Sequence, residues 1–413
     1  MLESEQKHIE ERLAVGLAAD LPTVVFQDRF ERCRNMMRQN DVDALLIYSG
    51  YPEILGREWA RYFVNYVPAL FAEEALIFIP REGEAVYLMN AGWMIDTAKK
   101  GSPIVKDIRP ISNKRFTDTK RYQGTADILK NLIEDRSLHN ATIGLCLWGM
   151  KGDIIPNMLY KVIQEGCSGT KLIDVSERLF ELIQIKTNFD IKMIRKTVEI
   201  NCDGISACFE ALREGGAEYD GYLAFQSAIA DRGADLPPFY CYVWSGPAAE
   251  LSLRPYWATA RKLRRGDMYF IDPGICYKGY YSDLRRTAVI GQPSTEQKKL
   301  YDLALKALNR MVEKLRVGER ASVIAEAWQD EIDKSGYHVP TPLLGHGVGI
   351  LCNETPYIVP GSNDIIKENM VISLESLVHV PGGTGAPIED TYLVTSEGVE
   401  RLTTGNQELY VVS

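Results

Sequence analysis

The sequence lacks the features that direct a protein to a membrane or to an oxidising compartment. No apolar run approaches the roughly 20 residues that a membrane span needs. The N-terminal segment is charged and has no apolar core of signal-peptide length. The eight cysteines are scattered without paired spacings, which predicts reduced thiols rather than a disulfide framework. We therefore expect a cytoplasmic protein with no membrane partner.

Basic residues are also fewer than acidic residues. Lys and Arg number 47 against 56 Asp and Glu, which gives a formal net charge of -9. Nucleic-acid binding depends on neutralising phosphates, so this balance argues against a nucleic-acid partner. The densest basic run, residues 261–265, is short and ends in a Gly-Asp turn. The sequence has no internal repeat and no low-complexity tract.

The length and the pattern of apolar residues predict two domains. A chain of 413 residues is too long for a single core. Within residues 25–175, short apolar runs typical of strands (43–48, 74–80, 84–89, 141–147) alternate with helical stretches (93–100, 123–135), which indicates an α/β domain. From residue 174 the pattern is first helical and then mostly β, with helices expected at 295–315 and 320–335. The predicted domains are residues 1–173 (α/β) and 174–413 (α+β).

A stretch in the second domain, residues 268–287, reads as a β-hairpin that carries two acids. If its turn is centred between Tyr277 and Lys278, Asp272 lies directly opposite Asp283. Directly opposed residues have Cβ atoms roughly 5 Å apart. Two ionised carboxylates at that separation repel each other unless a cation lies between them or one is protonated. The hairpin therefore predicts a metal site.

Three residues further along the chain extend this site. His346 is framed by glycines that leave its imidazole accessible, although alone it would fit a buried structural histidine. Glu375 ends an apolar run, where a lone carboxylate is costly. Glu389 and Glu375 are symmetric about Gly382, which predicts a second hairpin with its acids paired across the strands. Four carboxylates and one imidazole suit two divalent ions such as Mn, Co, Fe or Zn, which can lower the pKa of a water between them.

The motifs Asp-x-Gly, Tyr-Ser-Asp-Leu-x-Arg-Thr, Gly-His-Gly-x-Gly and Ile-Glu-Asp-Thr resemble those of the pita-bread metallopeptidases. This family includes methionine aminopeptidase, prolidase, aminopeptidase P and creatinase. The separations of 11, 29 and 14 residues between the acids and the histidine are most similar to prolidase-type members. The resemblance is strong over residues 176–405 and weaker in the N-terminal domain, which resembles the creatinase/prolidase N-terminal domain.

The resemblance implies a pita-bread catalytic domain, a homodimer, and a hydrolase whose nearest family substrates are Xaa-Pro dipeptides. It implies that Glu375 also acts as the acid and base toward the water between the metals. The implied ligands of the dinuclear site are Asp272, Asp283, His346, Glu375 and Glu389.

The sequence departs from the family pattern where peptides are handled. Asn353 stands where these peptidases carry a second histidine, and an amide cannot take or deliver a proton at neutral pH. A further family histidine before the first Asp has no counterpart in residues 245–271. Pro387 replaces an arginine, which removes a cation from the expected pocket wall.

Three other residues are candidates with a plain structural alternative. His379 shares a strand face with Glu375 and could reach the pocket, or could simply hydrogen-bond at the end of the hairpin. Tyr280 is a candidate for substrate binding, although one of the two adjacent tyrosines is expected to pack in the core. Arg61 could reach a partner subunit's pocket or lie on a helix surface. Together with Glu375 and Asn353, His379 completes the predicted catalytic set.

Three functions remain open from the sequence. The first is a metal-dependent hydrolase that cleaves a C–N bond in a short peptide or other small molecule. The second is a divergent family member that acts on a non-peptide, as a hydrolase or lyase similar to ectoine hydrolase or dimethylsulfoniopropionate lyase. The third is a non-catalytic binding protein, which the retained ligand set disfavours.

Overall fold

The chain separates into two compact units, residues 1–182 and 183–413. The predicted boundary between residues 173 and 174 stays a prediction. The computed structural model describes residues 21–50, 58–66, 74–90, 92–111, 122, 124–149, 152–235, 238, 240–246, 257–337, 343–379 and 385–413.

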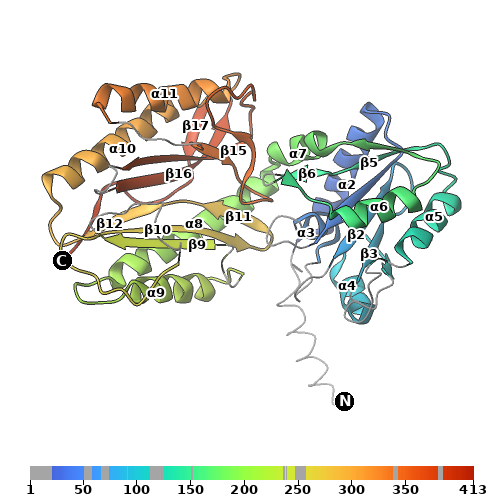
Figure 1. Cartoon of the computed structure of the whole chain (residues 1–413), viewed down its shortest axis with the longest axis horizontal. Helices are drawn as coiled ribbons and strands as arrows, with labels where there is room; N and C mark the ends of the chain where they lie inside the picture. The colour runs from blue at the N-terminus through green and yellow to red at the C-terminus, as the bar shows by residue number, and fades with distance from the viewer. Residues whose placement is uncertain are drawn as a thin grey trace, which may run out of the picture. The chain divides into compact units, whose positions relative to one another are not determined.

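The first unit is built on a six-stranded sheet with the order β4-β3-β2-β1-β5-β8 (Figure 1). Strands β1 and β2 are buried along their whole length, as expected from their continuous apolar runs. The pairs β1–β2 and β2–β3 are antiparallel, whereas β1–β5, β5–β8 and β3–β4 are parallel. The α/β domain expected from the sequence is confirmed.

The predicted strands and helices of the first unit occur in the expected order, and further elements lie between them. The elements of this unit are α2 (Thr23–Gln39), β1 (Ala44–Ser49), α3 (Glu58–Val64), β2 (Ala75–Pro80), β3 (Val86–Met89), η1 (Gly92–Met94), α4 (Ile95–Gly101), β4 (Asp107–Pro110), α5 (Thr125–Asp135), β5 (Thr142–Leu145), β6 (Trp148–Gly149), β7 (Gly152–Asp153), α6 (Asn157–Gly166), β8 (Lys171–Asp174) and α7 (Ser176–Gln184).

The second unit pairs two five-stranded sheets with helices on their outer sides. Its elements are α8 (Asn188–Ala211), α9 (Glu218–Asp231), β9 (Tyr240–Gly246), β10 (Met268–Tyr277), β11 (Tyr280–Asp283), β12 (Arg286–Ile290), α10 (Thr295–Lys314), α11 (Ala321–Ser335), β13 (Gly345–Gly347), β14 (Glu354–Tyr357), β15 (Val371–His379), β16 (Gly385–Thr395), β17 (Gly398–Arg401) and β18 (Tyr410–Val412).

The long helices of this unit begin at sequence-encoded caps. Thr187 and Asp190 form a reciprocal capping box that starts α8, and Ser294 and Gln297 form another that starts α10. Helix α8 packs on β10 and β11, and α10 packs on β15 and β16 (Figure 1). The two sheets, β11-β10-β12-β18 with β9 on β10, and β14-β13-β15-β16-β17, lie between these helices. This arrangement confirms the predicted pita-bread domain.

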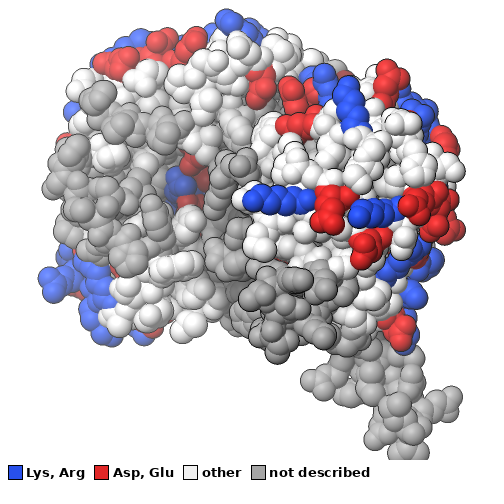
Figure 2. Space-filling view, turned by 45° about the vertical axis from the view of Figure 1, so that its right-hand side comes forward, with Lys and Arg blue, Asp and Glu red and all other residues white. Residues whose placement is uncertain are grey.

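Figure 2 shows charged side chains of both signs on the face in view. Among the described residues, no helix is both long and apolar enough to cross a membrane.

The homodimer expected from the sequence stays a prediction. The role of Arg61, which is half-buried in α3, also stays a prediction.

Candidate metal centre

The first predicted hairpin forms, but its register differs from the expected one. Lys278 and Gly279 form a two-residue turn with φ values of 51° and 87°, and Tyr277 pairs with Tyr280. Asp283 therefore lies opposite Gly274, so the expected pairing of Asp283 with Asp272 is wrong. Because the shift is two residues, both acids still share one face of the sheet and lie diagonally across it. The sequence prediction failed because the turn is centred one residue later than assumed.

The second predicted hairpin has the expected register. Glu375 in β15 pairs with Glu389 in β16, with nine successive pairs from Val371–Leu393 to His379–Gly385. Its turn, around Gly382, lies outside the described residues. The isolated bridge between Arg285 and Glu389 links this hairpin to the first one and brings the acids of the two sheets together.

His346 enters the site from β13, which pairs with β15. A Cβ on Gly345 would lie 2.4 Å from the carbonyl oxygen of Ser373, so only glycine allows this close approach. His346 Nδ1 lies 2.9 Å from the carbonyl oxygen of Gly347, an acceptor that fixes the hydrogen on Nδ1 of the neutral ring. Nε2 then presents a lone pair, 3.3 Å from Asp283 Oδ2. Two metal ligands on one ion have a separation of this order.

The residues present fit a divalent ion. Asp283, His346 and Glu389 are buried, and each offers a ligand atom within 4.8 Å of the other two. Among the described residues, three buried carboxylate oxygens have no hydrogen-bond partner: Asp272 Oδ1, Asp283 Oδ1 and Glu389 Oε1. Buried carboxylate oxygens without partners are costly, because nothing replaces the water that they lose. A bound cation would remove that cost.

The electrostatics of the site point the same way. Burial raises the pKa of Asp272 to about 7, with the Arg285 charge opposing and Asp283 adding to the rise. Burial and the neighbouring carboxylates of Asp283 and Glu375 raise the pKa of Glu389 well above its usual range. Burial tends to lower the pKa of His346, but the contact with Asp283 outweighs it and the pKa is raised. Burial and the closeness of the acids to one another thus both disfavour the charged carboxylates, and a bound cation would oppose this.

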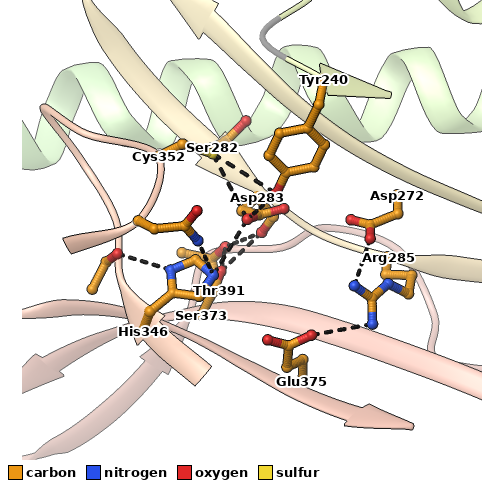
Figure 3. A network of polar contacts seen from close by, with 12 residues as sticks. Tyr240, Asp272, Ser282, Asp283, Arg285, His346, Cys352, Ser373, Glu375 and Thr391 are labelled. Carbon is orange, nitrogen blue, oxygen red and sulfur yellow. Dashed lines mark hydrogen bonds and ion pairs between the residues drawn. The ribbon is translucent and has the colours of Figure 1, made fainter. Parts of the chain in front are cut away.

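Among the described residues, Arg285 adds positive charge to this site, and sequence reasoning missed it. Its guanidinium contacts Asp272 Oδ2 through Nη2 at 2.5 Å and Glu375 Oε2 through Nη1 at 3.1 Å (Figure 3). The sequence predicted that Pro387 removes a cation from the pocket wall. Arg285, which lies outside the strand that carries Pro387, supplies a cation to the site instead. Arg286 serves a different purpose: it donates to Asp390 Oδ1 at 2.5 Å and to the Glu389 carbonyl oxygen at 2.6 Å.

Asp283 is held from three sides. The hydroxyls of Ser373 and Thr391 each donate to its main-chain carbonyl oxygen at 2.9 Å (Figure 3). The hydroxyl of Tyr240, from β9, donates to its side-chain Oδ2. Burial raises the pKa of Tyr240 well above its usual range, so it stays a donor. Sequence reasoning missed Tyr240 because its role depends on β9 pairing with β10, opposite Gly274.

Asn353 lies against the predicted metal ligand. Its Nδ2 donates to His346 Nε2 at 2.6 Å. The loop before it is held by Glu354, whose Oε1 accepts hydrogen bonds from the amides of Ile350 and Leu351 at 2.6 and 2.9 Å. Before His346 can bind a metal through Nε2, the Asn353 amide must give up this hydrogen bond.

The other predicted residues are placed less centrally. Tyr280 is fully buried, and its hydroxyl donates to Asp190 at 2.7 Å. Substrate binding by Tyr280 stays a prediction, and this contact argues for a packing role instead. His379 ends β15, four residues beyond Glu375 and opposite Gly385. Its catalytic role also stays a prediction.

Comparisons with known proteins show which family the chain resembles. Residues 192–396 match metallopeptidase family M24, and residues 29–183 match the Creatinase/Prolidase N-terminal domain. An Xaa-Pro dipeptidase from Pyrococcus furiosus is 33% identical over 395 residues, which cover 93% of this chain and 99% of the relative.

Solved structures share the fold over most of the chain. A prolidase from Thermococcus sibiricus superposes with a TM-score of 0.79 at 25% identity, covering 94% of this chain and 99% of its own. The N-terminal domain of the FACT complex subunit SPT16 from Cicer arietinum has a TM-score of 0.70 at 17% identity, covering 95% and 100%, which shows the fold alone. With a third of its residues shared with a full-length relative, the chain belongs to metallopeptidase family M24, a family of hydrolases, and carries the creatinase/prolidase N-terminal domain.

Proposed function

We propose that the chain is a metal-dependent hydrolase that cleaves a C–N bond in a small substrate, with Xaa-Pro dipeptides as the first class to test. One observation carries the proposal: Asp283, His346 and Glu389 converge in a buried site, where carboxylate oxygens have no partner among the described residues. The dipeptidase from Pyrococcus furiosus supports the choice of substrate.

The roles follow from exposure and contacts. Asp283, His346 and Glu389 would hold a divalent ion, which when bound polarises a carbonyl group and lowers the pKa of water. Glu375 has a side chain that is 14% exposed, against 2% for Asp272 and Asp283. It is therefore the carboxylate best placed to exchange a proton with substrate and water. Arg285 holds one of its oxygens and so orients the group.

A non-peptide substrate is the second candidate, and Asn353 favours it. An amide at that position donates a hydrogen bond but cannot transfer a proton to a leaving amine. Its contact with His346 Nε2 ties it to the predicted ligand. A hydrolase or lyase that acts on a small carboxylate does not need a second histidine there.

The proposal predicts that His346→Ala abolishes both metal binding and turnover. Purified protein is reconstituted with Mn, Co, Fe or Zn, its metal content is measured by mass spectrometry, and hydrolysis of Xaa-Pro and Met-Xaa dipeptides is followed. We expect at least one ion per chain and turnover of one of these peptides by the unchanged protein.

The matched control is His139→Ala, an exposed histidine of the first unit, which should leave both properties unchanged. Bound metal without turnover of any peptide would favour the non-peptide substrate. A folded chain that binds no ion would refute the proposal and favour a binding protein.

A further inference from the structure

Arg285 lies directly across the sheet from Asp272. Along β10, Gly274 pairs with Asp283 and Ile271 pairs with Arg286. Both pairs have the same antiparallel register, and this register places Arg285 opposite Asp272. Side chains alternate along a strand, so Arg285 faces the same side as Asp283. The sequence predicted that the acids Asp272 and Asp283 lie opposite each other. In the structure, the residue opposite Asp272 is instead the positively charged Arg285.

The backbone fixes this position. The amide of Glu389 donates to the Arg285 carbonyl oxygen at 3.1 Å, and the amide of Arg285 faces the Glu389 carbonyl oxygen at 3.5 Å. The side chain is only 14% exposed, so its guanidinium is enclosed by the acids that it contacts. These acids come from different sheets, Asp272 from β10 and Glu375 from β15 (Figure 3).

The five predicted ligands thus divide into two groups. Asp272 and Glu375 share one guanidinium. Asp283, His346 and Glu389 form the metal-ligand group that converges among the described residues, and neither Asp272 nor Glu375 belongs to it.

The charges favour one ion over two. A guanidinium stays protonated in proteins, so Arg285 keeps its positive charge and would repel a second cation bound beside it. Two divalent ions would bring four positive charges to four carboxylates, and Arg285 would add a fifth in a buried site where repulsion is weakly screened. One divalent ion together with Arg285 leaves the acids nearly neutralised.

We infer that the guanidinium of Arg285 takes the place of a second metal ion on Asp272 and Glu375. The chain then binds a single divalent ion on Asp283, His346 and Glu389. This inference rests on the proposed function for its metal ion, and it departs from the dinuclear site that the family resemblance implies.

The test measures how many Mn or Co ions bind per chain, by elemental mass spectrometry and titration calorimetry, so it does not depend on activity. We expect one ion in the unchanged protein and two in Arg285→Ala, where Asp272 and Glu375 lose their cation. Arg285→Lys keeps the charge and should bind one ion. The control Arg310→Ala removes an exposed arginine on α10 and should also bind one.

Two further variants decide the question in chains that keep Arg285. Asp272→Asn should still bind one ion, with affinity changed by less than about threefold, whereas Asp283→Asn should lose it. Two ions in the unchanged protein, or one in a folded Arg285→Ala, would overturn the inference and leave the hydrolase proposal standing. No ion in the unchanged protein would overturn the hydrolase proposal itself.

Discussion

Lys186, in the second unit, carries a buried charge that is matched by a single acid. Its ammonium group pairs with Glu354, and the two side chains are 2% and 0% exposed. The same carboxylate accepts the amides of Ile350 and Leu351, so it orders the loop that carries Asn353. This ion pair therefore supports the candidate metal centre through the loop that carries Asn353.

We predict that Lys186→Met lowers the free energy of unfolding by about 3–5 kcal/mol, because it leaves the Glu354 charge buried and unpaired. Urea unfolding measures the change. The matched control is Lys196→Met, whose ion pair with Glu199 is exposed and worth less than about 1 kcal/mol. Equal effects of the two substitutions would contradict this account.

Three neighbouring strands place Tyr240, Gly274 and Asp283 in one line across the sheet. A Cβ on Gly274 would lie 2.7 Å from the Tyr240 ring and 3.0 Å from Cys352 Sγ. The glycine of the Asp-x-Gly motif therefore leaves the space through which the Tyr240 hydroxyl reaches Asp283. The motif was recognised from the sequence, but this reason for it was not.

We predict that Gly274→Ala displaces Tyr240, costs about 1–3 kcal/mol of stability through crowding, and weakens metal binding about tenfold or more. Thermal unfolding and metal titration measure the two effects. Tyr240→Phe should weaken metal binding with a smaller loss of stability, because it removes only the hydroxyl. Gly92→Ala is the control, since its Cβ meets nothing closer than 3.7 Å. Unchanged metal affinity in Gly274→Ala would refute the idea that Gly274 leaves the space through which Tyr240 reaches Asp283.

The hairpins also show where reasoning from sequence succeeds. The symmetry of Glu375 and Glu389 about Gly382 gave the correct register, because the nine pairs of that hairpin run without an interruption. The first hairpin was misjudged because Lys278 adopts a positive φ, which its residue type does not favour. An error of one residue at the turn centre moved every cross-strand partner by two.

Both units bury cysteine thiols, and their burial makes the stability of the fold depend on pH. Burial raises the pKa of Cys33, Cys146 and Cys208 from 9.0 to about 12. In the unfolded chain these thiols lose their protons near pH 9, whereas the folded chain keeps them until about pH 12. Their contribution to stability is therefore complete below pH 9 and is lost as the pH rises toward 12.

We predict that the thermal unfolding midpoint is steady from pH 7 to 8.5 and falls steadily between pH 9 and 11. Iodoacetamide at pH 9 should label the half-buried Cys202 in the folded protein. It should label the buried Cys33, Cys146 and Cys208 only after unfolding in urea. A flat midpoint to pH 11, or rapid labelling of Cys208 in the folded chain, would contradict the prediction.

The sequence by itself determined the two-domain architecture, the family and the set of acids with His346, because apolar periodicity and motif spacing are local properties of the chain. Only the tertiary structure decided which of these groups meet. Arg285 lies across from Asp272, and Tyr240 reaches Asp283, through strand registers set by one turn and by the pairing of β9 with β10. The sequence therefore predicts a metal site, and the cross-strand contacts indicate how many cations it needs from solution.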